Sequence, residues 1–329
     1  MDLIRLHRAH WRWLALTGHR DLTSAVSELN YRRPDAVVCS GPADVVKIGA
    51  GLPSCWGDVP LAVYFHESQW TYPDPELDPR PYVTAHLDAL ERANAVWFNS
   101  AYHLRAFHEA ATTNPSLRVR RLAREIIPAN WHKTRVLHPP VLVSHLPGER
   151  AACEQPAIAW AARWEREKRP DVFVEAIQMC LAGGLRPRIY LLGIPAGLEG
   201  IAGQLPADVR SLLALGSGYP ARGEYEAALA RADLWVSTAA HEFFGVAAIE
   251  AALLGATPIL PRSLAYPETL PSAPTYAPGD PSDLARVILA LAERRFQQPA
   301  PWQIDASRFH AARAAERFDE LIGELVAGS

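Results

Sequence analysis

Short apolar runs alternate with helical stretches along the second half of the chain. The runs that have the length and composition of buried strands are 157–161, 188–192, 211–215, 234–236 and 257–260. The stretches whose apolar residues recur with helical spacing are 170–181, 224–232, 246–254, 282–295 and 307–326. Strand–helix alternation at this spacing predicts a parallel, Rossmann-like sheet.

The first half of the chain shows the same alternation less regularly. Apolar runs predict strands at 35–39, 59–65 and 95–98, and helical spacing is present at 21–31 and 83–93. The segment between the second strand and the next helix is rich in proline, which indicates a loop. We therefore expect a second sheet of the same kind in this half.

A segment with Pro147, Gly148 and Pro156 separates the two halves and is typical of a linker. The sequence thus predicts an α/β protein with two Rossmann-like domains facing a cleft. We place the first domain at 1–146, the linker at 147–156 and the second domain at 157–329. The last helix is expected to cross back to the first domain. Two such domains would suit a nucleotide-linked transferase.

Within residues 234–268, the strand–loop–helix–strand part at 234–260 carries two carboxylates that lie eight residues apart. Glu242 lies in the loop at the mouth of the helix, and Glu250 lies inside the helix among alanines and leucines. Helix statistics alone favour a solvent-facing Glu250, because carboxylates are rarely buried. A carboxylate that does enter so apolar a run needs a partner or water. Its spacing from Glu242, and cations at a neighbouring strand end, favour this second interpretation.

Two cations follow the first predicted strand of the second domain. Arg163 and Lys168 stand between the end of that strand and a helix that begins near Asp171. A diphosphate can bind there to both cations and to the positive end of the helix. A second helix mouth, at 244–246, offers backbone N–H groups in the same way. Neither a G-x-G-x-x-G nor a Walker pattern is present, so nothing supports an NAD or ATP motif.

Polar residues also follow two strands of the first domain. His66, Glu67 and Gln69 come directly after one strand, and Asn99 follows the next. Ligands of open α/β sheets gather outside the carboxyl ends of the strands, so these residues stand where a polar site is expected. The alternative is that they are merely hydrogen-bonded loop residues.

Composition narrows the class of protein. With 329 residues, 49% hydrophobic and 21% charged, the chain is long enough for two medium domains and is ordinary for a globular protein. No apolar run approaches a membrane span, and the start lacks the apolar core of a secretory signal. The four cysteines have no metal-like or paired spacing, which fits reduced thiols in a cytoplasm and no metal site. The net charge of −3 gives no global basic field.

The balance of charge nevertheless differs along the chain, with 17 Lys/Arg against 15 Asp/Glu in residues 1–150 and 16 against 21 in the remainder. Residues 5–13 mix arginine, histidine and tryptophan, and residues 114–135 include Arg120, Arg121 and Arg124 with few acidic neighbours. Such runs are usually solvated surface. The alternative is a patch that binds the phosphates of a nucleic acid.

The segment EFFGVAAIE, from Glu242 to Glu250, resembles the E-x7-E motif of retaining GT-B glycosyltransferases, and ARWEREK resembles their diphosphate-binding Arg and Lys. The resemblance implies that Glu242 and 243–246 (Phe243, Phe244, Gly245, Val246) hold the donor sugar and phosphate. Glu250 would then hold the ribose. Gly216 and Ser217, after another strand, would complete the donor site. Such enzymes need no metal, and Arg163 and Lys168 would stabilise the departing diphosphate.

A narrower resemblance extends through most of the chain. The segments VSTAAHEFFGVAAIEA, PRSLAYPE, YFHESQWTYP and WFNSAYH are similar to those of the tRNA-queuosine mannosyltransferases. This resemblance implies transfer of mannose from GDP-mannose to the cyclopentenediol of queuosine in tRNA, in the cytoplasm and without a cofactor. His66 would then join Glu242, Arg163 and Lys168 as a catalytic residue. The acceptor side would comprise Glu67, Gln69, Asn99, Arg120, Arg121 and Arg124.

One departure from that family concerns the start of the chain. Family members begin with a strand and a glycine-rich loop before a tryptophan-rich segment, whereas this chain begins almost at that segment, Trp11–Trp13. We therefore expect a first domain without its first strand and glycine-rich loop. Two alternatives stay open: a glycosyltransferase with another sugar or acceptor, and a non-catalytic protein that binds a nucleotide sugar or RNA.

Overall fold

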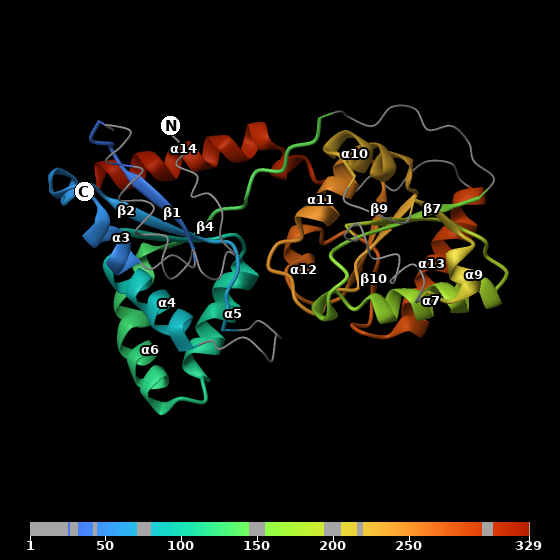
Figure 1. Ribbon diagram of the computed structural model, residues 1–329, viewed down its shortest axis with the longest axis horizontal. Coiled ribbons are helices and arrows are strands. Elements are labelled where there is room, and N and C mark those ends of the chain that lie inside the picture. The colour runs from blue at the N-terminus through green and yellow to red at the C-terminus, as the bar shows by residue number, and fades with distance from the viewer. Residues whose placement is uncertain are drawn as a thin grey trace. The chain divides into compact units, whose positions relative to one another are not determined.

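A computed structural model describes most of the chain (Figure 1). The described residues are 26, 32–41, 45–70, 80–144, 155–193, 205–215, 220–297 and 305–328. The chain divides into two compact units, one of Met1–Pro139 with Ala315–Ser329 and the other of Pro140–Ala314. The basic and aromatic run at 5–13, the predicted helix at 21–31 apart from residue 26, most of the proline-rich loop, the centre of the linker, and Gly216 and Ser217 lie outside the described residues.

The first unit is built on a parallel sheet of order β1-β2-β3-β4. The strands are β1 (Val37–Gly41), β2 (Leu61–Phe65), β3 (Ala95–Phe98) and β4 (Thr134–Val136). The helices are α3 (Val45–Gly51), α4 (Arg80–Arg92), α5 (Ala101–Thr112) and α6 (Leu117–Asn130), with 3-10 turns η1 (Ser54–Trp56) and η2 (Trp131–Lys133). The end of α14 (Ala311–Ala327) also belongs to this unit.

Side chains that alternate along β2 and β3 pack in two cores, one on each face of this sheet. Val63 and Phe65 of β2 belong to a core that includes residues of α4, α5 and α6. Tyr64 belongs to a second core, where Leu321 and Leu325 of α14 cover the opposite face. Figure 1 shows α14, in red, beside the blue strands, although the two segments lie at opposite ends of the sequence.

The second unit contains a parallel sheet of order β10-β9-β8-β5-β6-β7. Its strands are β5 (Ala157–Ala161), β6 (Arg188–Leu192), β7 (Leu213–Leu215), β8 (Leu234–Val236), β9 (Thr257–Pro261) and β10 (Thr275–Tyr276). Its helices are α7 (Pro170–Ala182), α9 (Ala207–Arg210), α10 (Arg222–Arg231), α11 (Val246–Leu253), α12 (Tyr266–Thr269), α13 (Pro281–Gln297) and the start of α14, with 3-10 turns η3 (Arg166–Lys168) and η4 (Ser307–Phe309).

The strand order of this unit reverses between β5 and β8. The chain runs outward from β5 through β6 to β7, then returns to pair β8 with the other side of β5. From β8 it runs outward again through β9 to β10. This is the doubly wound order of Rossmann domains, in which ligands bind beyond the carboxyl ends of the strands at the reversal.

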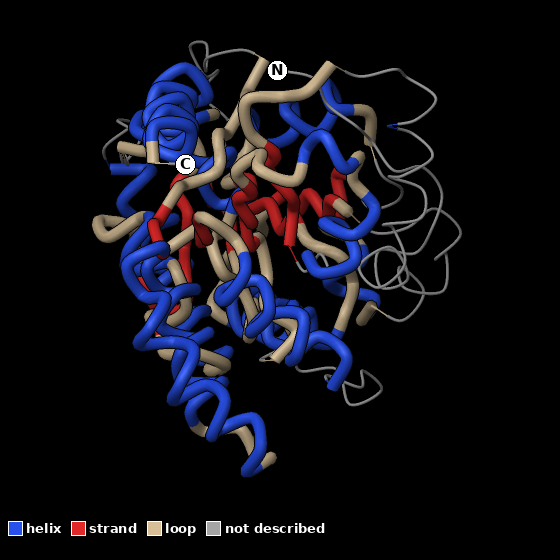
Figure 2. The backbone as a smooth tube through the Cα atoms, turned by 90° about the vertical axis from the view of Figure 1, so that its left-hand side faces the viewer, coloured by secondary structure: helices blue, strands red, loops and turns tan. Residues whose placement is uncertain are grey.

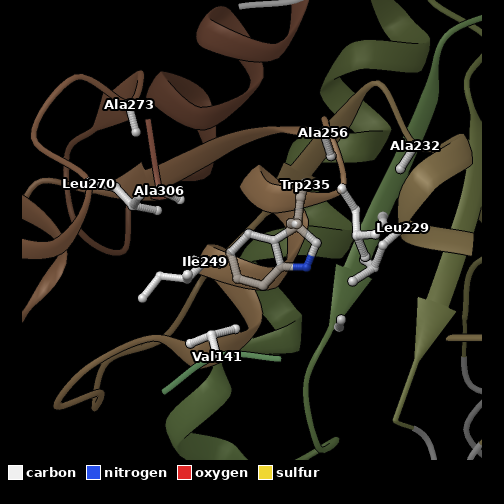
Figure 3. Close-up of a cluster of buried hydrophobic side chains, with 14 of the residues drawn as sticks. Val141, Leu229, Ala232, Trp235, Ile249, Ala256, Leu270, Ala273 and Ala306 are labelled. Atoms are coloured by element: carbon white, nitrogen blue, oxygen red, sulfur yellow. The ribbon is translucent and has the colours of Figure 1, made fainter. Parts of the chain in front are cut away.

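Helices cover the two faces of this sheet, because its side chains belong to two separate cores. Figure 2 colours the helices blue and the strands red. Ile158 and Trp160 of β5 pack in one core with residues of α7 and α13. Ala157 and Ala159 face the other core, which includes residues of α10 and α11. Figure 3 shows Trp235 of β8 at the centre of that second core.

The division between the units lies earlier than the predicted linker. Val141 and Val143 are buried in the core around Trp235, so the segment after Pro140 packs with the second unit. The Val141 N–H donates to the Phe309 carbonyl at 2.8 Å, and the Ala311 N–H donates to the Val141 carbonyl at 3.0 Å. The burial of Val141 and Val143 therefore places the boundary between the units before residue 147, the predicted start of the linker.

Two elements differ from the sequence prediction for identifiable reasons. The basic run at 114–135 contains helix α6, which buries only Ala123 and Ile127 and so has too sparse an apolar stripe to be recognised. Strand β4 follows it as a three-residue strand, too short to give an alternation. Within the part of the chain that the structure describes, no helix is long and apolar enough to cross a membrane.

His86 of α4 is a buried titratable group in the first unit. Its ring packs against Phe65, Trp70 and Phe107, with centroids 5.0, 5.2 and 6.0 Å away. Neither ring nitrogen has a hydrogen-bond partner among the described residues. Burial lowers the pKa of His86 from 6.5 to about 3. The imidazole is therefore neutral in the folded protein at neutral pH.

We expect His86 to make the protein sensitive to mild acid. The unfolded chain takes up a proton at this position near pH 6.5, and the folded chain does so only near pH 3. The free energy of unfolding should therefore fall by about 2 kcal/mol between pH 7 and pH 5 through this group alone. Urea denaturation at both pH values should show a smaller fall for His86→Leu. The control is His132→Gln, at an exposed position; an equal fall in wild type and His86→Leu would contradict the assignment.

Candidate functional site

Side chains tie the loop after β5 to the loop after β8 at the strand reversal. The indole N–H of Trp160 donates to the Thr238 hydroxyl oxygen at 3.0 Å. That hydroxyl donates in turn to the backbone carbonyl of Lys168 at 2.6 Å. The Ala240 N–H donates to the carbonyl of Glu167 at 2.8 Å. These bonds bring the residues that follow the two strands to one place.

Lys168 and Glu242 meet there as an ion pair. The Lys168 ammonium lies 3.3 Å from Glu242 Oε2 and 3.3 Å from the carbonyl oxygen of His241. Glu242 Oε1 accepts from the N–H groups of Phe243 and Phe244 at 3.1 and 3.4 Å. Burial alone would raise the pKa of Glu242, but Lys168 and the backbone N–H groups of Phe244 and Gly245 lower it below its ordinary value. Glu242 is therefore ionised at neutral pH.

Gly245 sets the start of helix α11 next to this carboxylate. Its φ is +88°, in the left-handed region that glycine adopts without strain. A Cβ here would lie 2.7 Å from Cε1 of Tyr266, so a larger residue would force the Tyr266 ring to move. The Tyr266 hydroxyl is fixed by the Ser237 hydroxyl at 2.7 Å. The first-turn N–H groups of α11 thus form a positive helix end beside Glu242.

Arg163 lies on the same loop but is engaged by acidic neighbours. Its guanidinium donates to Glu165 at 3.0 Å and lies 3.6 Å from Glu167. Burial and a hydrogen bond with Glu167 raise the pKa of Glu165 to about 7. Both cations predicted from the sequence, the half-exposed Arg163 and Lys168, thus lie in the loop that follows the carboxyl end of β5.

His241 adds a neutral imidazole to the loop. Burial, with a smaller effect of the Lys168 charge, lowers the pKa of His241 to about 4. Its ring meets the Phe243 ring edge to face, with centroids 4.7 Å apart. The two loops together present the Lys168 ammonium, the Glu242 carboxylate, backbone N–H groups and an uncharged imidazole.

Glu250 is buried, at 7% exposure, and does not face solvent as helix periodicity alone suggested. Its Oε1 accepts from Arg222 at 2.7 Å and its Oε2 accepts from the Tyr225 hydroxyl at 2.9 Å. Both partners lie on α10, which packs beside α11. The desolvation cost of the carboxylate is therefore offset by a cation and a hydroxyl.

In the first unit, His66, Glu67, Gln69 and Asn99 follow the adjacent strands β2 and β3. His66 is exposed, its ring lies 4.3 Å from that of Tyr64, and partial burial lowers its pKa. The Asn99 amide donates to the carbonyl of His66 at 2.7 Å and pairs with His103 at 2.9 Å. Asn99 is 4% exposed and Gln69 is 1% exposed, so these two amides lie beneath the loop.

The predicted basic residues lie on α6. Arg121 and Arg124 are exposed, and Arg121 pairs loosely with Glu125 at 3.6 Å. Arg120 instead donates to the carbonyl of Asn114 at 2.6 Å, just before the helix. The exposed pair, and not Arg120, presents positive charge to solvent.

Sequence reasoning missed Arg222, Tyr225 and Tyr266. The one available signal was that Tyr266 belongs to the motif PRSLAYPE. Nothing in the local sequence joins Arg222 to Glu250, because the two lie 28 residues apart. Among the described residues, no group of three or more His, Cys, Asp or Glu is arranged to hold a metal ion.

Gly245 and Gly184 allow a matched test of the helix start. Both have a φ of +88°, but a Cβ at Gly184 meets nothing within 4 Å. We expect Gly184→Ala to lower the free energy of unfolding by about 1 kcal/mol, through backbone strain alone. Gly245→Ala should cost about 3 kcal/mol, because the Tyr266 ring must also move. Equal losses in urea denaturation would contradict a steric role for Tyr266.

The comparisons with known proteins cover both parts of the chain. A family model described as "tRNA-queuosine alpha-mannosyltransferase N-terminal" matches residues 1–141. The curated tRNA-queuosine alpha-mannosyltransferase of Drosophila melanogaster is 27% identical in an alignment of 297 positions, which covers 84% of this chain and 75% of that protein.

Solved structures share the fold at low sequence identity. Sucrose-phosphate synthase from Thermosynechococcus elongatus superimposes with a TM-score of 0.69 at 16% identity, over 98% of this chain and 81% of that one. A glycosyltransferase from Rickettsia africae gives 0.67 at 13% identity, over 100% and 85%. Anabaena HepE in complex with UDP and glucose gives 0.64 at 15% identity, over 93% and 81%. The chain has the GT-B glycosyltransferase fold, and its resemblance to the tRNA-queuosine alpha-mannosyltransferase family is confirmed.

Proposed function

We propose that this protein is a retaining glycosyltransferase that moves mannose from GDP-mannose to the cyclopentenediol of queuosine in tRNA. The glycosyltransferase class rests on the fold and on the named relative from Drosophila melanogaster. The sugar and the acceptor rest on the resemblance to that relative. A tRNA substrate also implies that the protein works in the cytoplasm.

The observation that carries the proposal is the ionised Glu242 beside Lys168 at the strand reversal. Lys168, Arg163 and the first turn of α11 supply positive charge for a diphosphate. Glu242 offers a carboxylate to the hydroxyls of a sugar joined to that diphosphate. Glu250 accepts hydrogen bonds from the ribose of the nucleotide in this proposal.

The proposed reaction breaks the bond between the anomeric carbon of mannose and the phosphate oxygen. The electron pair leaves with the diphosphate, whose growing charge Lys168 and Arg163 stabilise. A hydroxyl of the cyclopentenediol forms the new bond on the same face of the sugar, and its proton passes to the departing phosphate. Retention of configuration follows from attack on that face. His66 is proposed to stand on the acceptor side.

The first unit supplies the proposed acceptor surface. Arg121 and Arg124 place exposed positive charge on α6, which suits the phosphates of RNA. The exposed indole of Trp131, 42% exposed just beyond the helix, adds an aromatic face of the kind that stacks on bases. Glu67 and the exposed His66 are the polar groups of the β2 loop.

A transfer assay tests the function directly. We expect the wild-type protein to move label from GDP-[14C]mannose to tRNA that contains queuosine. Glu242→Ala should lower kcat by about 10²-fold, because the sugar loses a charged contact that strengthens in the transition state. Liquid scintillation counting of precipitated RNA gives both rates.

The outcomes separate the alternatives. The matched control is Glu175→Ala, an exposed glutamate on α7, which should keep the wild-type rate. Tight GDP binding without labelled RNA would favour a non-catalytic nucleotide-sugar or RNA-binding protein. Label on a lipid or on free sugar would refute the tRNA acceptor, and label only from another nucleotide sugar would refute mannose.

Charge reversal on α6 tests the RNA surface. We expect the double variant Arg121→Glu/Arg124→Glu to weaken tRNA binding. The slope of log Kd against log salt should fall by about 2 units, because two phosphate contacts are lost. Binding titrations at several salt concentrations measure both quantities. Arg231→Glu/Arg286→Glu, at exposed helix positions of the second unit, is the control. The same slope in wild type and the α6 variant would assign these arginines to ordinary solvated surface.

A further inference from the structure

One guanidinium bridges two buried carboxylates in the second unit. Arg222, the first residue of α10, donates from Nε to Glu226 at 2.6 Å and from Nη1 to Glu250 at 2.7 Å. Its Nη2 donates to the carbonyl of Leu142 at 2.6 Å. Glu226 is 3% exposed and Glu250 is 7% exposed, whereas Arg222 is half-exposed. The cation therefore lies at the surface above two carboxylates beneath it.

The remaining oxygens of the two carboxylates are also bonded. Glu226 Oε2 accepts from the Ser144 N–H at 2.9 Å, and Glu250 Oε2 accepts from the Tyr225 hydroxyl at 2.9 Å. Burial would lower the pKa of Arg222, but its bonds to the carboxylates raise it above its ordinary value. Each of the four carboxylate oxygens therefore has a hydrogen-bond donor.

Glu250 keeps acceptor capacity inside this network. An ionised carboxylate has about four acceptor positions, two on each oxygen. Arg222 and Tyr225 occupy one position on each oxygen of Glu250. One position on each oxygen is left for two neighbouring hydroxyls of a ligand. The Arg222 fork and the Tyr225 hydroxyl hold the carboxylate plane in one orientation for such a pair.

Replacing Arg222 would alter the orientation or the protonation of the Glu250 carboxylate, although Glu250 itself is unchanged. Glu226 and Glu250 would then be two buried acidic groups with no cation between them, and one of them would turn toward water or take up a proton. Either response removes the fixed pair of acceptor positions. Lysine could restore the charge but not the fork, since an ammonium is a point donor.

We propose that Arg222 is a positioning residue that orients Glu250 to recognise the vicinal hydroxyls of the donor ribose. The inference rests on the proposed role of Glu250 in nucleotide-sugar binding. It adds a residue from another helix, α10, to the donor site, and this residue acts through Glu250 and does not touch the reacting atoms. It also assigns the specificity for a ribonucleotide to the Arg222–Glu250–Tyr225 group.

Paired ligands that differ only in the ribose hydroxyls test this proposal. Calorimetric titration with GDP and with 2′,3′-dideoxy-GDP measures the preference for the ribose. We expect the wild type to bind GDP at least tenfold more tightly. In Arg222→Ala the GDP affinity should fall until the two ligands bind equally, while the dideoxy ligand keeps its wild-type affinity. Arg222→Lys should recover part of the preference.

Two further variants separate positioning from folding. Glu250→Gln should lose the preference, and adding Arg222→Ala to it should change neither affinity further, because Arg222 acts only through Glu250. If Arg222→Ala fails to fold, the double variant Arg222→Ala/Glu226→Gln, which removes the second buried charge together with the cation, should fold and should lack the ribose preference. Arg286→Ala, which breaks an Arg–carboxylate pair of 2.6 Å with Asp283, is the matched control and should keep the wild-type ratio.

The outcomes distinguish this inference from the proposed function. A wild-type protein without ribose preference, an Arg222→Ala variant that keeps it, or an equal loss for both ligands would overturn the positioning role. A ribose preference that Arg222→Ala abolishes, in a protein that transfers no mannose to queuosine-containing tRNA, would refute the proposed function and support the role of Arg222.

Discussion

The parallel pairing of β5 with β8 is the constraint on which the candidate site depends. Because the strand order reverses there, the two strands send their chains to opposite faces of the sheet: α7 packs in one core and α11 in the other. The loops after the strands must diverge, which leaves backbone groups at the reversal without sheet partners. The Thr238 hydroxyl binds one of those backbone groups, the carbonyl of Lys168, and so holds the two loops together. Lys168 and Glu242 come into contact as a result.

The sequence predicts most of the second unit because its strands are buried on both faces. Continuous apolar runs at 157–161, 188–192 and 234–236 match the observed strands β5, β6 and β8 residue for residue. The first unit is harder to predict. Helix α6 buries only Ala123 and Ile127, and strand β4 has three residues, so neither produces a periodic signal. Hydrophobic periodicity reflects the burial of side chains, so it does not reveal a helix or strand that buries few of them.

The candidate site also has one part that could be predicted from the sequence and one part that could not. Lys168 and Glu242 could be predicted to approach each other, because each follows a buried strand and such ends converge at the reversal. The surroundings of Glu250 could not. Periodicity describes one helix at a time, whereas Arg222 and Tyr225 come from α10. The burial of Glu250 is decided by these tertiary partners, which supply the charge and the hydroxyl that an apolar helix face lacks.

The Thr238 hydroxyl limits what evolution can place at its position. It accepts from the Trp160 indole and donates to the Lys168 carbonyl, so one atom serves both directions. Valine, although equal in shape, would leave a buried donor and a buried acceptor unpaired at the same time. Cysteine would form weaker bonds, and serine alone preserves the relay in full. Sequence drift at this position is therefore restricted to two hydroxyl side chains for as long as the tryptophan remains beneath it.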